Sequence, residues 1–160
     1  MAKERFSATQ AIRELRKHGA HFTLRTYKFE EKGGTEVAAR ELGLDENLVV
    51  KTLVMEDELG SPFLVLMHGD RQVSTKALAR VLGVKSVRPC EPHAAYKHTG
   101  YFVGGISPFG TRKPLRVLIE ESILGLHKIY INAGKKGLLA EMSPGVLGKI
   151  LNPTPVSVAI

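Results

Sequence analysis

Lys51 lies where a lysine is energetically costly, and it is the first candidate for chemistry in this chain. The stretch "LVVKTLVM", residues 48–55, predicts a β-strand. Alternate side chains of a strand share a face, so Lys51 would lie between Val49 and Leu53. A lysine among apolar residues needs polar partners for its tip. It either snorkels at a sheet edge or forms the floor of a cleft, where its cation would bind a phosphate or a carbonyl group.

The glycine-rich stretch "TGYFVGGISPFGTRKP", residues 99–114, is the second candidate. The Gly104–Gly105 pair would let backbone N–H groups approach a ligand without interference from a Cβ atom. The alternative is a bulge or a corner of a curled sheet. The stretch "INAGKKG", residues 131–137, repeats the pattern of glycines beside cations. It is either a basic hairpin turn or, together with the first stretch, the lining of an anion-binding groove.

Metal and nucleophile signatures are weak. His93 and His98 are five residues apart, which places them on different faces of a helix, and no other pair has the spacing of zinc ligands. Cys90 has no His–Asp arrangement that would activate it, so a packed thiol is the simpler interpretation. We therefore expect no metal and no cofactor.

The composition favours an anionic partner. The 160 residues include 23 Lys plus Arg against 16 Asp plus Glu, a formal charge of +7. Nucleic acid is one such partner, and a basic enzyme without a polyanion is the alternative. Trp is absent and aromatic residues make up 6%, so we expect one or two stacked bases at most. No apolar run would span a membrane and the N-terminus lacks the apolar segment of a signal peptide, which favours a cytoplasmic protein.

The elements that must position these residues are short and irregularly ordered. Helices are expected over residues 7–19, 33–43, 74–84 and 143–151, with a single helical turn over 91–98. Ser7, Thr35 and Ser143 are the expected caps. Extended segments or strands are expected over 21–29, 48–55, 63–69, 86–90, 100–105, 115–121, 127–134 and 155–160. Without a regular βαβ alternation, this order predicts one α+β domain over residues 1–160, with a mixed and curled sheet.

Three segments resemble the YbaK family, the free-standing relatives of the editing domain in bacterial prolyl-tRNA synthetases. They are "KTLVM" around Lys51, "TGYFVGGISPFG" over 99–110 and "IYINAGKKG" over 129–137. The resemblance covers nearly the whole chain, in the family's order. It implies a mixed, partly closed, barrel-like sheet flanked by helices. It also implies release of a wrong amino acid from tRNA, usually tRNA-Pro, by hydrolysis or by cyclisation through the substrate's thiol.

The resemblance assigns roles to individual residues. The catalytic groups would be Lys51, Gly104 and Gly105. The substrate-binding residues would be Tyr27, Ile106, Ser107, Pro108, Asn132, Gly134 and Leu139. The tRNA phosphates would meet Lys113, Lys135 and Lys136. Relatives identified with Cys-tRNA carry a serine and an aspartate where this chain has Asn132 and Leu139, which leaves the preferred amino acid open.

The sequence therefore predicts a trans-editing deacylase that removes a small amino acid, Cys ahead of Ala, from tRNA-Pro. Its partners would be the acceptor end of aminoacyl-tRNA and, transiently, prolyl-tRNA synthetase. A non-catalytic module that binds aminoacyl-tRNA or a synthetase is the second interpretation. An unrelated small-molecule hydrolase is the third, and the missing nucleophile and metal count against it.

Overall fold

A mixed eight-stranded sheet organises the computed structural model, which describes residues 8–160. The strand order is β1-β7-β6-β2-β3-β5-β8, and β4 pairs with β2 outside this path. The strands are β1 (Thr23–Thr26), β2 (Val49–Asp57), β3 (Pro62–His68), β4 (Val87–Pro89), β5 (Val117–Glu120), β6 (Ile129–Lys135), β7 (Leu138–Met142) and β8 (Thr154–Val156). The predicted α+β class with a mixed sheet is confirmed. The sheet is open, because β1 and β8 end the strand order without pairing to each other.

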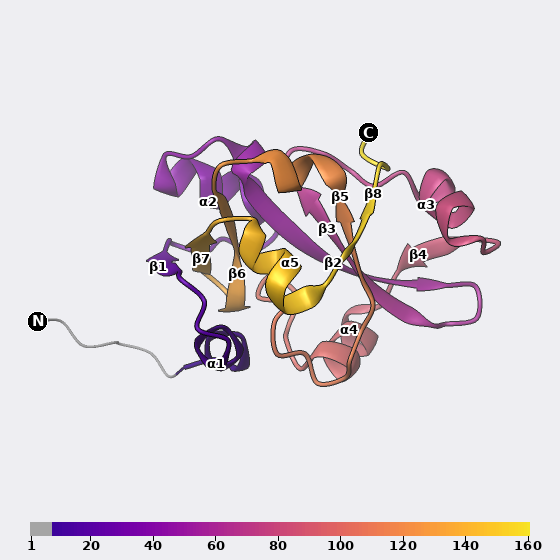
Figure 1. Cartoon of the computed structure of the whole chain (residues 1–160), viewed down its shortest axis with the longest axis horizontal. Coiled ribbons are helices and arrows are strands. Elements are labelled where there is room, and N and C mark those ends of the chain that lie inside the picture. Colours follow the sequence, from indigo (N-terminus) through magenta and orange to yellow (C-terminus); the bar gives the residue numbers. More distant parts are fainter. Residues whose placement is uncertain (1–7) are drawn as a thin grey trace, which may run out of the picture.

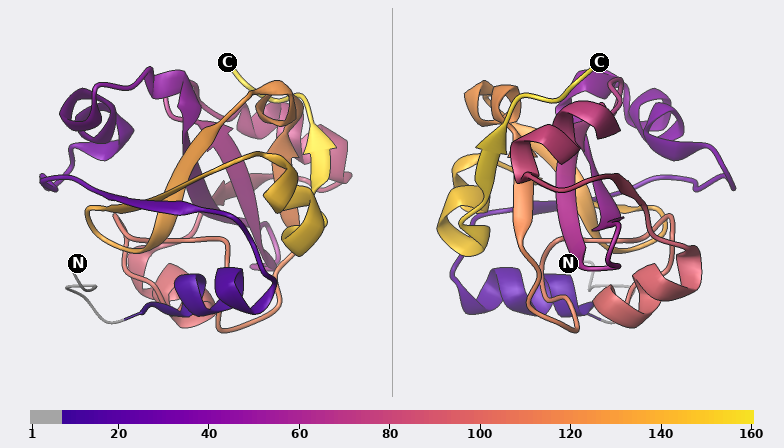
Figure 2. Two further views of the ribbon diagram at one scale, coloured as in Figure 1. Left: turned by 60° about the vertical axis from the view of Figure 1, so that its left-hand side comes forward. Right: turned by 90° about the vertical axis from the view of Figure 1, so that its right-hand side faces the viewer.

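Five α-helices surround the sheet (Figures 1 and 2). In all three views α1 and α4 lie at one end of the molecule, and α2 and α3 lie nearer the other end. The helices are α1 (Gln10–Lys17), α2 (Gly34–Leu42), α3 (Thr75–Leu82), α4 (Pro92–Thr99) and α5 (Gly145–Leu151). None of these helices, all within residues 8–160, is both long and apolar enough to cross a bilayer.

The side chains of β2 alternate between two hydrophobic clusters of the core. Val50 and Val54 belong to the cluster that also contains the buried stripe of α1, Ala11, Ile12 and Leu15. Met55 and the half-buried Leu53 belong to a second cluster, which contains Leu78 of α3. Lys51 shares its face with Leu53 and Met55, as the period of two requires.

Several expected boundaries are wrong. Residues 100–105 form turns and not a strand, because Gly100 and Gly104 adopt positive φ angles of 82° and 96°. Strand β7 was not expected at all. The helix beginning at Pro92 has eight residues instead of a single turn.

The helix caps also differ from expectation. Thr9 caps α1 by accepting the N–H of Ile12, and Ser7 lies outside the described residues. Thr35 lies inside α2, whose N-cap is Gly33. Pro144, and not Ser143, occupies the N-cap position of α5.

Candidate functional site

The site begins with a gap along one edge of β2. β3 pairs with the other edge from Val50 to Glu56. On the gap edge, β6 pairs in parallel with Val49 and Val50, and β4 pairs with residues from Met55 onward. Among residues 8–160, no strand lies along this edge between Lys51 and Leu53. A cavity therefore opens where β6 and β4 diverge.

Thr52 presents its polar groups to this gap. The N–H of Cys90 bonds to Val54 O at 2.9 Å, which shows that Val54 turns its backbone toward the gap edge. Residues two apart on a strand direct their N–H and C=O groups to the same side, so Thr52 does likewise. Its Oγ1 is buried and has no hydrogen-bond partner in the described part of the chain. Buried polar groups are normally paired, so this unpaired hydroxyl is an exception in the cavity floor, and the groups of Thr52 that face the gap are its backbone N–H and C=O.

The cavity has a volume of about 620 Å³. Its floor is β2 from Val49 to Val54, and its walls come from the segment after β1, the start of α2, the loop after α4, and β6 and β7. The lining is mostly apolar with a few polar groups, the usual character of a ligand site. The wall residues are Tyr27, Phe29, Glu31, Lys32, Gly34, Thr35, Ala38, Cys90, Ala95, Val103, Gly104, Ile106, Asn132 and Leu139.

Lys51 is the cation in the floor of this cavity. Its Nζ lies 3.4 Å from the carbonyl oxygen of Gly69, the residue that follows β3. Burial lowers the pKa of Lys51, while the carboxylates of Glu46 and Asp70 act in the opposite direction. The ammonium is thus held by one carbonyl and two nearby acids, with donors left to bind a ligand.

Gly69 brings the start of α2 against β2. The hydroxyl of Thr35 lies 2.7 Å from Glu46 Oε2 and 3.1 Å from Gly69 O, and its single proton serves one of them at a time. A Cβ atom on Gly69 would lie 2.7 Å from both Thr35 Oγ1 and Val49 O. Only glycine fits, and the close approach places Thr35 beside the carbonyl that holds Lys51.

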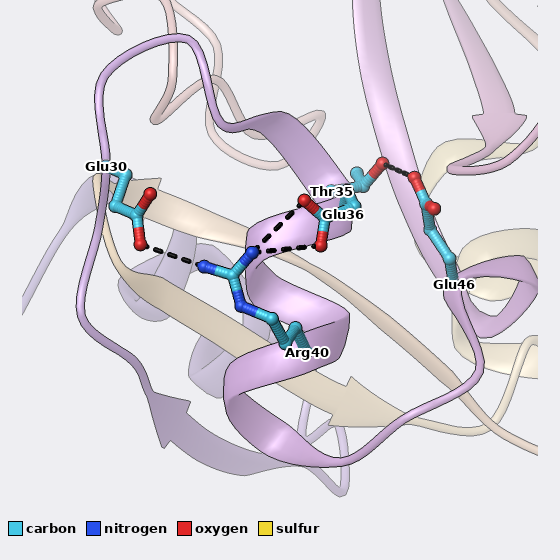
Figure 3. A network of polar contacts seen from close by, with 5 residues as sticks. All are labelled: Glu30, Thr35, Glu36, Arg40 and Glu46. Carbon is cyan, nitrogen blue, oxygen red and sulfur yellow. Dashed lines mark hydrogen bonds and ion pairs between the residues drawn. The ribbon is translucent and has the colours of Figure 1, made fainter.

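Arg40 fixes the loop before α2, as Figure 3 shows. Its guanidinium lies 2.9 Å from Glu30 of that loop and 3.2 Å from Glu36 of the helix. Beyond the loop, Lys136 pairs with Glu31 at 3.1 Å and lies 5.2 Å from the centre of the Phe29 ring. These exposed contacts join the cavity rim to the β6–β7 turn.

The two adjacent glycines have different roles. Gly104 lines the cavity, and a Cβ atom there would lie 3.0 Å from the Phe29 ring. Gly105 is buried, its N–H donates to Phe102 O at 2.8 Å, and a Cβ atom there would lie 2.8 Å from Lys136 N. Gly105 is therefore a packing glycine in this conformation. The N–H groups of Gly104 and Ile106 have no acceptor among residues 8–160.

The side chain of Asn132 forms hydrogen bonds with the surrounding backbone. Its Oδ1 accepts the N–H groups of Gly134 and Lys135, at 2.6 and 3.1 Å, where the β6–β7 register shifts. Its Nδ2 donates to Gly104 O at 3.3 Å. The amide thus connects the end of β6 to the glycine loop.

The structure brings together some of the predicted substrate-binding residues and separates others. Tyr27, Ile106, Asn132 and Leu139 line the cavity with Lys51 and Gly104. The remaining three pack outside the lining: Ser107 and Pro108 are buried, and a Cβ atom on Gly134 would lie 2.8 Å from the Tyr101 ring. Of the predicted phosphate contacts, Lys135 ends β6 and Lys136 lies in the turn that follows it, whereas Lys113 lies in the loop after α4.

Cys90 lines the cavity, and its thiol is a poor nucleophile. Burial, followed by its hydrogen bond to Glu56 at 3.4 Å, raises the pKa of this thiol to about 12. A thiol needs its deprotonated form to attack a carbonyl, so Cys90 stays protonated near neutral pH.

Sequence reasoning missed Thr35, Thr52 and Gly69 as site residues. Thr35 and Gly69 are 34 positions apart, and their contact depends on packing that no local pattern encodes. Thr52 offered one signal, a hydroxyl in an otherwise apolar strand.

Comparison with known proteins adds a consistent set of relatives. The family model described as "Aminoacyl-tRNA editing domain" matches residues 30–150. A protein of Enterococcus faecalis, provisionally described as the Cys-tRNA(Pro)/Cys-tRNA(Cys) deacylase EbsC, is 28% identical over 156 residues, which are 95% of this chain and 94% of that protein. A proline–tRNA ligase of Thermodesulfovibrio yellowstonii is 34% identical over 121 residues, which are 75% of this chain but 20% of the ligase.

A solved structure supports the fold. It is described provisionally as a trans-editing enzyme for prolyl-tRNA synthetase, and it superposes with a TM-score of 0.84 over 94% of this chain and 95% of its own. The sequences are 22% identical, so this likeness concerns the fold alone.

Proposed function

This chain belongs to the family of aminoacyl-tRNA editing domains, and from that premise we propose that it is a trans-editing deacylase. It releases a small amino acid, Cys in the first place, from mischarged tRNA-Pro. The whole of residues 1–160 acts as one editing domain in the cytoplasm, where aminoacyl-tRNA is formed. The observation that carries the proposal is the ammonium of Lys51 inside an apolar cavity beside the Gly104 loop.

The cavity is large enough for more than an amino-acid side chain. Its volume of about 620 Å³ lies within the ~300–1,000 Å³ typical of small-molecule sites. We assign it the aminoacyl group together with the terminal adenosine of the tRNA. The backbone C=O of Thr52 would then accept a hydrogen bond from the substrate's ammonium group.

Lys51 and the glycine loop supply the electrostatics. Negative charge develops on the ester carbonyl oxygen when the carbonyl carbon is attacked. The Lys51 ammonium and the unpaired N–H groups of Gly104 and Ile106 are the donors available to this oxygen. One such donor typically contributes about 10²–10³ in rate.

The nucleophile comes from the substrate or from solvent. In Cys-tRNA the substrate's sulfur attacks its own carbonyl carbon, forming a C–S bond while the ester C–O bond breaks. The ribose oxygen leaves and takes up the proton that the thiol has lost, and the product is a cyclic thioester. This intramolecular route has a large proximity advantage. Ala-tRNA lacks a thiol, so water must attack its ester. We therefore expect Cys to be released faster than Ala.

Initial rates of release test the proposal. Cys-, Ala-, Ser- and Pro-tRNA-Pro are compared with the tRNA body held constant, and we expect Cys to be released fastest. Faster release of Ala than of Cys would exclude attack by the substrate thiol. No release above the spontaneous rate would favour the non-catalytic binding module.

Lys51→Ala tests the site itself. We expect this variant to lose at least 10²-fold in rate, the range of a lost oxyanion donor, while its circular dichroism stays unchanged. The control is Lys149→Ala, because Lys149 is exposed on α5 and does not line the cavity. Full activity of a folded Lys51→Ala protein would remove Lys51 from the mechanism.

A further inference from the structure

Phe102 is a large aromatic side chain left exposed beside the cavity. It is 67% exposed, and its neighbour Val103 is 55% exposed. Its ring stacks on Tyr96 of α4, with ring centres 4.6 Å apart and planes 18° from parallel. One ring face of this pair is covered by its partner, and exposed apolar surface of this kind commonly marks an interaction site.

Arg112 and its loop hold this stack in place. The Arg112 guanidinium lies 4.9 Å from the centre of the Tyr96 ring. The backbone N–H of Arg112 donates to Thr99 O at 3.0 Å, and that of Lys113 donates to His98 O at 3.1 Å. The loop therefore closes the C-terminal end of α4, and the rings rest on two anchored segments.

The surroundings of the stack are positively charged. Lys97, Arg112 and Lys113 are all exposed. Burial lowers the pKa of His98, and the charges of Lys113 and Lys97 lower it further. Lys113 and Lys97 thus act together on His98, although the charge of Glu56 acts in the opposite direction, and an anionic chain is the complementary partner.

The stack also adjoins the cavity along the chain. Val103 and Gly104 line the cavity, and Phe102 precedes them directly. Consecutive Cα atoms are about 3.8 Å apart, so the backbone of Phe102 lies directly beside the residues of the cavity wall. α4 and the loop that follows it lie at the same end of the molecule (Figures 1 and 2).

We propose that Tyr96 and Phe102, together the aromatic platform, stack a base of the single-stranded acceptor end of tRNA. The base is a cytidine next to the terminal adenosine, and Lys97, Arg112 and Lys113 meet the adjoining phosphates. This inference rests on the proposed function, because it takes the terminal adenosine to occupy the cavity. Aromatic stacking is tolerant of sequence, and it typically strengthens binding about 5- to 160-fold per base.

A fluorescent tRNA-Pro transcript tests the platform directly. Pyrrolo-cytidine replaces one of the two cytidines before the terminal adenosine, and its quenching reports stacking. We expect quenching by the unchanged protein and by Phe102→Tyr, and clearly less quenching by Phe102→Ala or Phe102→Leu. Leucine keeps apolar surface but has no ring, so it separates stacking from simple contact. Leu59→Ala is the control, because Leu59 is 82% exposed in the turn between β2 and β3.

Kinetics on Cys-tRNA-Pro provide the second measurement. We expect kcat/KM to fall about tenfold in Phe102→Ala and Phe102→Leu with kcat unchanged, because Phe102 does not line the cavity. Unchanged quenching and KM in either variant would overturn the platform while leaving the deacylase in place. An unchanged protein that deacylates no aminoacyl-tRNA would instead overturn the proposed function.

Discussion

At the scale of single residues, the surroundings of Lys51 have opposite effects on its pKa. Burial favours its neutral amine, and the acids Glu46 and Asp70 favour its ammonium. Gly69 O lies 3.4 Å from Nζ and favours the ammonium as well. The protonation state of this residue is therefore adjustable from outside the cavity, through Glu46.

Glu46→Gln should move the alkaline limb of the activity profile to lower pH. Protonated Lys51 is the proposed active form, so activity falls as pH rises through its pKa, which lies below 10.5. Removing the Glu46 charge removes an influence that raises this pKa. The glutamine can still accept the Thr35 hydrogen bond, and exposed Glu41→Gln is the control. Rates are corrected for spontaneous ester hydrolysis, and an unmoved limb would contradict the role of Glu46.

The sequence allowed Lys51 to be predicted and left Thr52 out for a physical reason. A lysine on an apolar strand face is a local anomaly, visible within eight residues. The open backbone edge at Thr52 depends on β4 and β6 diverging, and these strands lie far along the chain. Such a gap is a property of the sheet and not of the strand.

At the scale of elements, the glycine loop is positioned by the β6–β7 turn. The backbone of Lys135 and Lys136 leaves no room for a Cβ atom on Gly105. The same turn is tied to Gly104 through Asn132. The donors proposed for catalysis therefore depend on a hairpin that follows them in the chain.

Gly105→Ala should lower both stability and activity. Its methyl group would lie 2.8 Å from Lys136 N and 2.9 Å from Lys135 C, so the loop must shift. Overpacking of this kind costs about 1–3 kcal/mol of unfolding free energy. Gly148→Ala is the control, because its Cβ meets nothing within 4 Å and alanine favours a helix. Urea unfolding and initial rates measure both effects, and wild-type stability would show that the loop has room to adjust.

Glu141→Gln should weaken the pairing of β1 with β7 in a pH-dependent way. Glu141 lies 2.7 Å from Arg25 of β1 and 3.1 Å from Lys128, and their hydrogen bonds hold its pKa below 4.5. A carboxyl group whose pKa is lower in the folded protein stabilises the fold at pH values above its pKa in the unfolded chain. This stabilisation is lost as the pH falls through the pKa of the folded state. We expect a loss of about 1 kcal/mol at pH 7, given partial exposure, and a smaller loss at pH 3, which lies below the pKa of the unfolded chain. Equal losses at both pH values in urea unfolding would contradict this.

The elements themselves were only partly predictable. The β2–β3 hairpin follows from two apolar runs around a polar turn. β7 was missed because "LLAEM" is rich in residues that favour a helix, and its strand conformation comes from pairing on both sides with β1 and β6. Residues 100–105 were assigned to a strand because of their apolar side chains, of which Tyr101 is buried while Phe102 and Val103 are exposed.

At the scale of the whole molecule, the charge of +7 matters through its distribution. Lys136 is paired with Glu31, whereas Lys97, Arg112 and Lys113 gather at the end of α4. The net charge predicted an anionic partner, but only the fold shows where these cations meet the aromatic platform. We therefore propose the region beside α4 as the place where most of the tRNA phosphates bind.

Binding of tRNA should therefore depend on salt. Neutralising roughly three single-strand phosphates would weaken binding about 20-fold between 50 and 200 mM salt. Lys97→Ala combined with Lys113→Ala should reduce this dependence to about 3-fold, because two contacts are lost. Lys17→Ala combined with Lys149→Ala removes the same charge elsewhere and serves as the control. Filter binding at several salt concentrations measures the slope, and equal slopes for both double variants would contradict the placement of the phosphates.

The gap in the edge of β2 has a consequence for the chain's behaviour at high concentration. An unpaired strand edge can recruit a strand from another molecule and start aggregation. Here the open edge runs only from Lys51 to Leu53, between β6 and β4. It is too short to hold a foreign strand, and a charged lysine at such an edge is itself a known deterrent. This gap in β2 is therefore not a template for amyloid-like self-association.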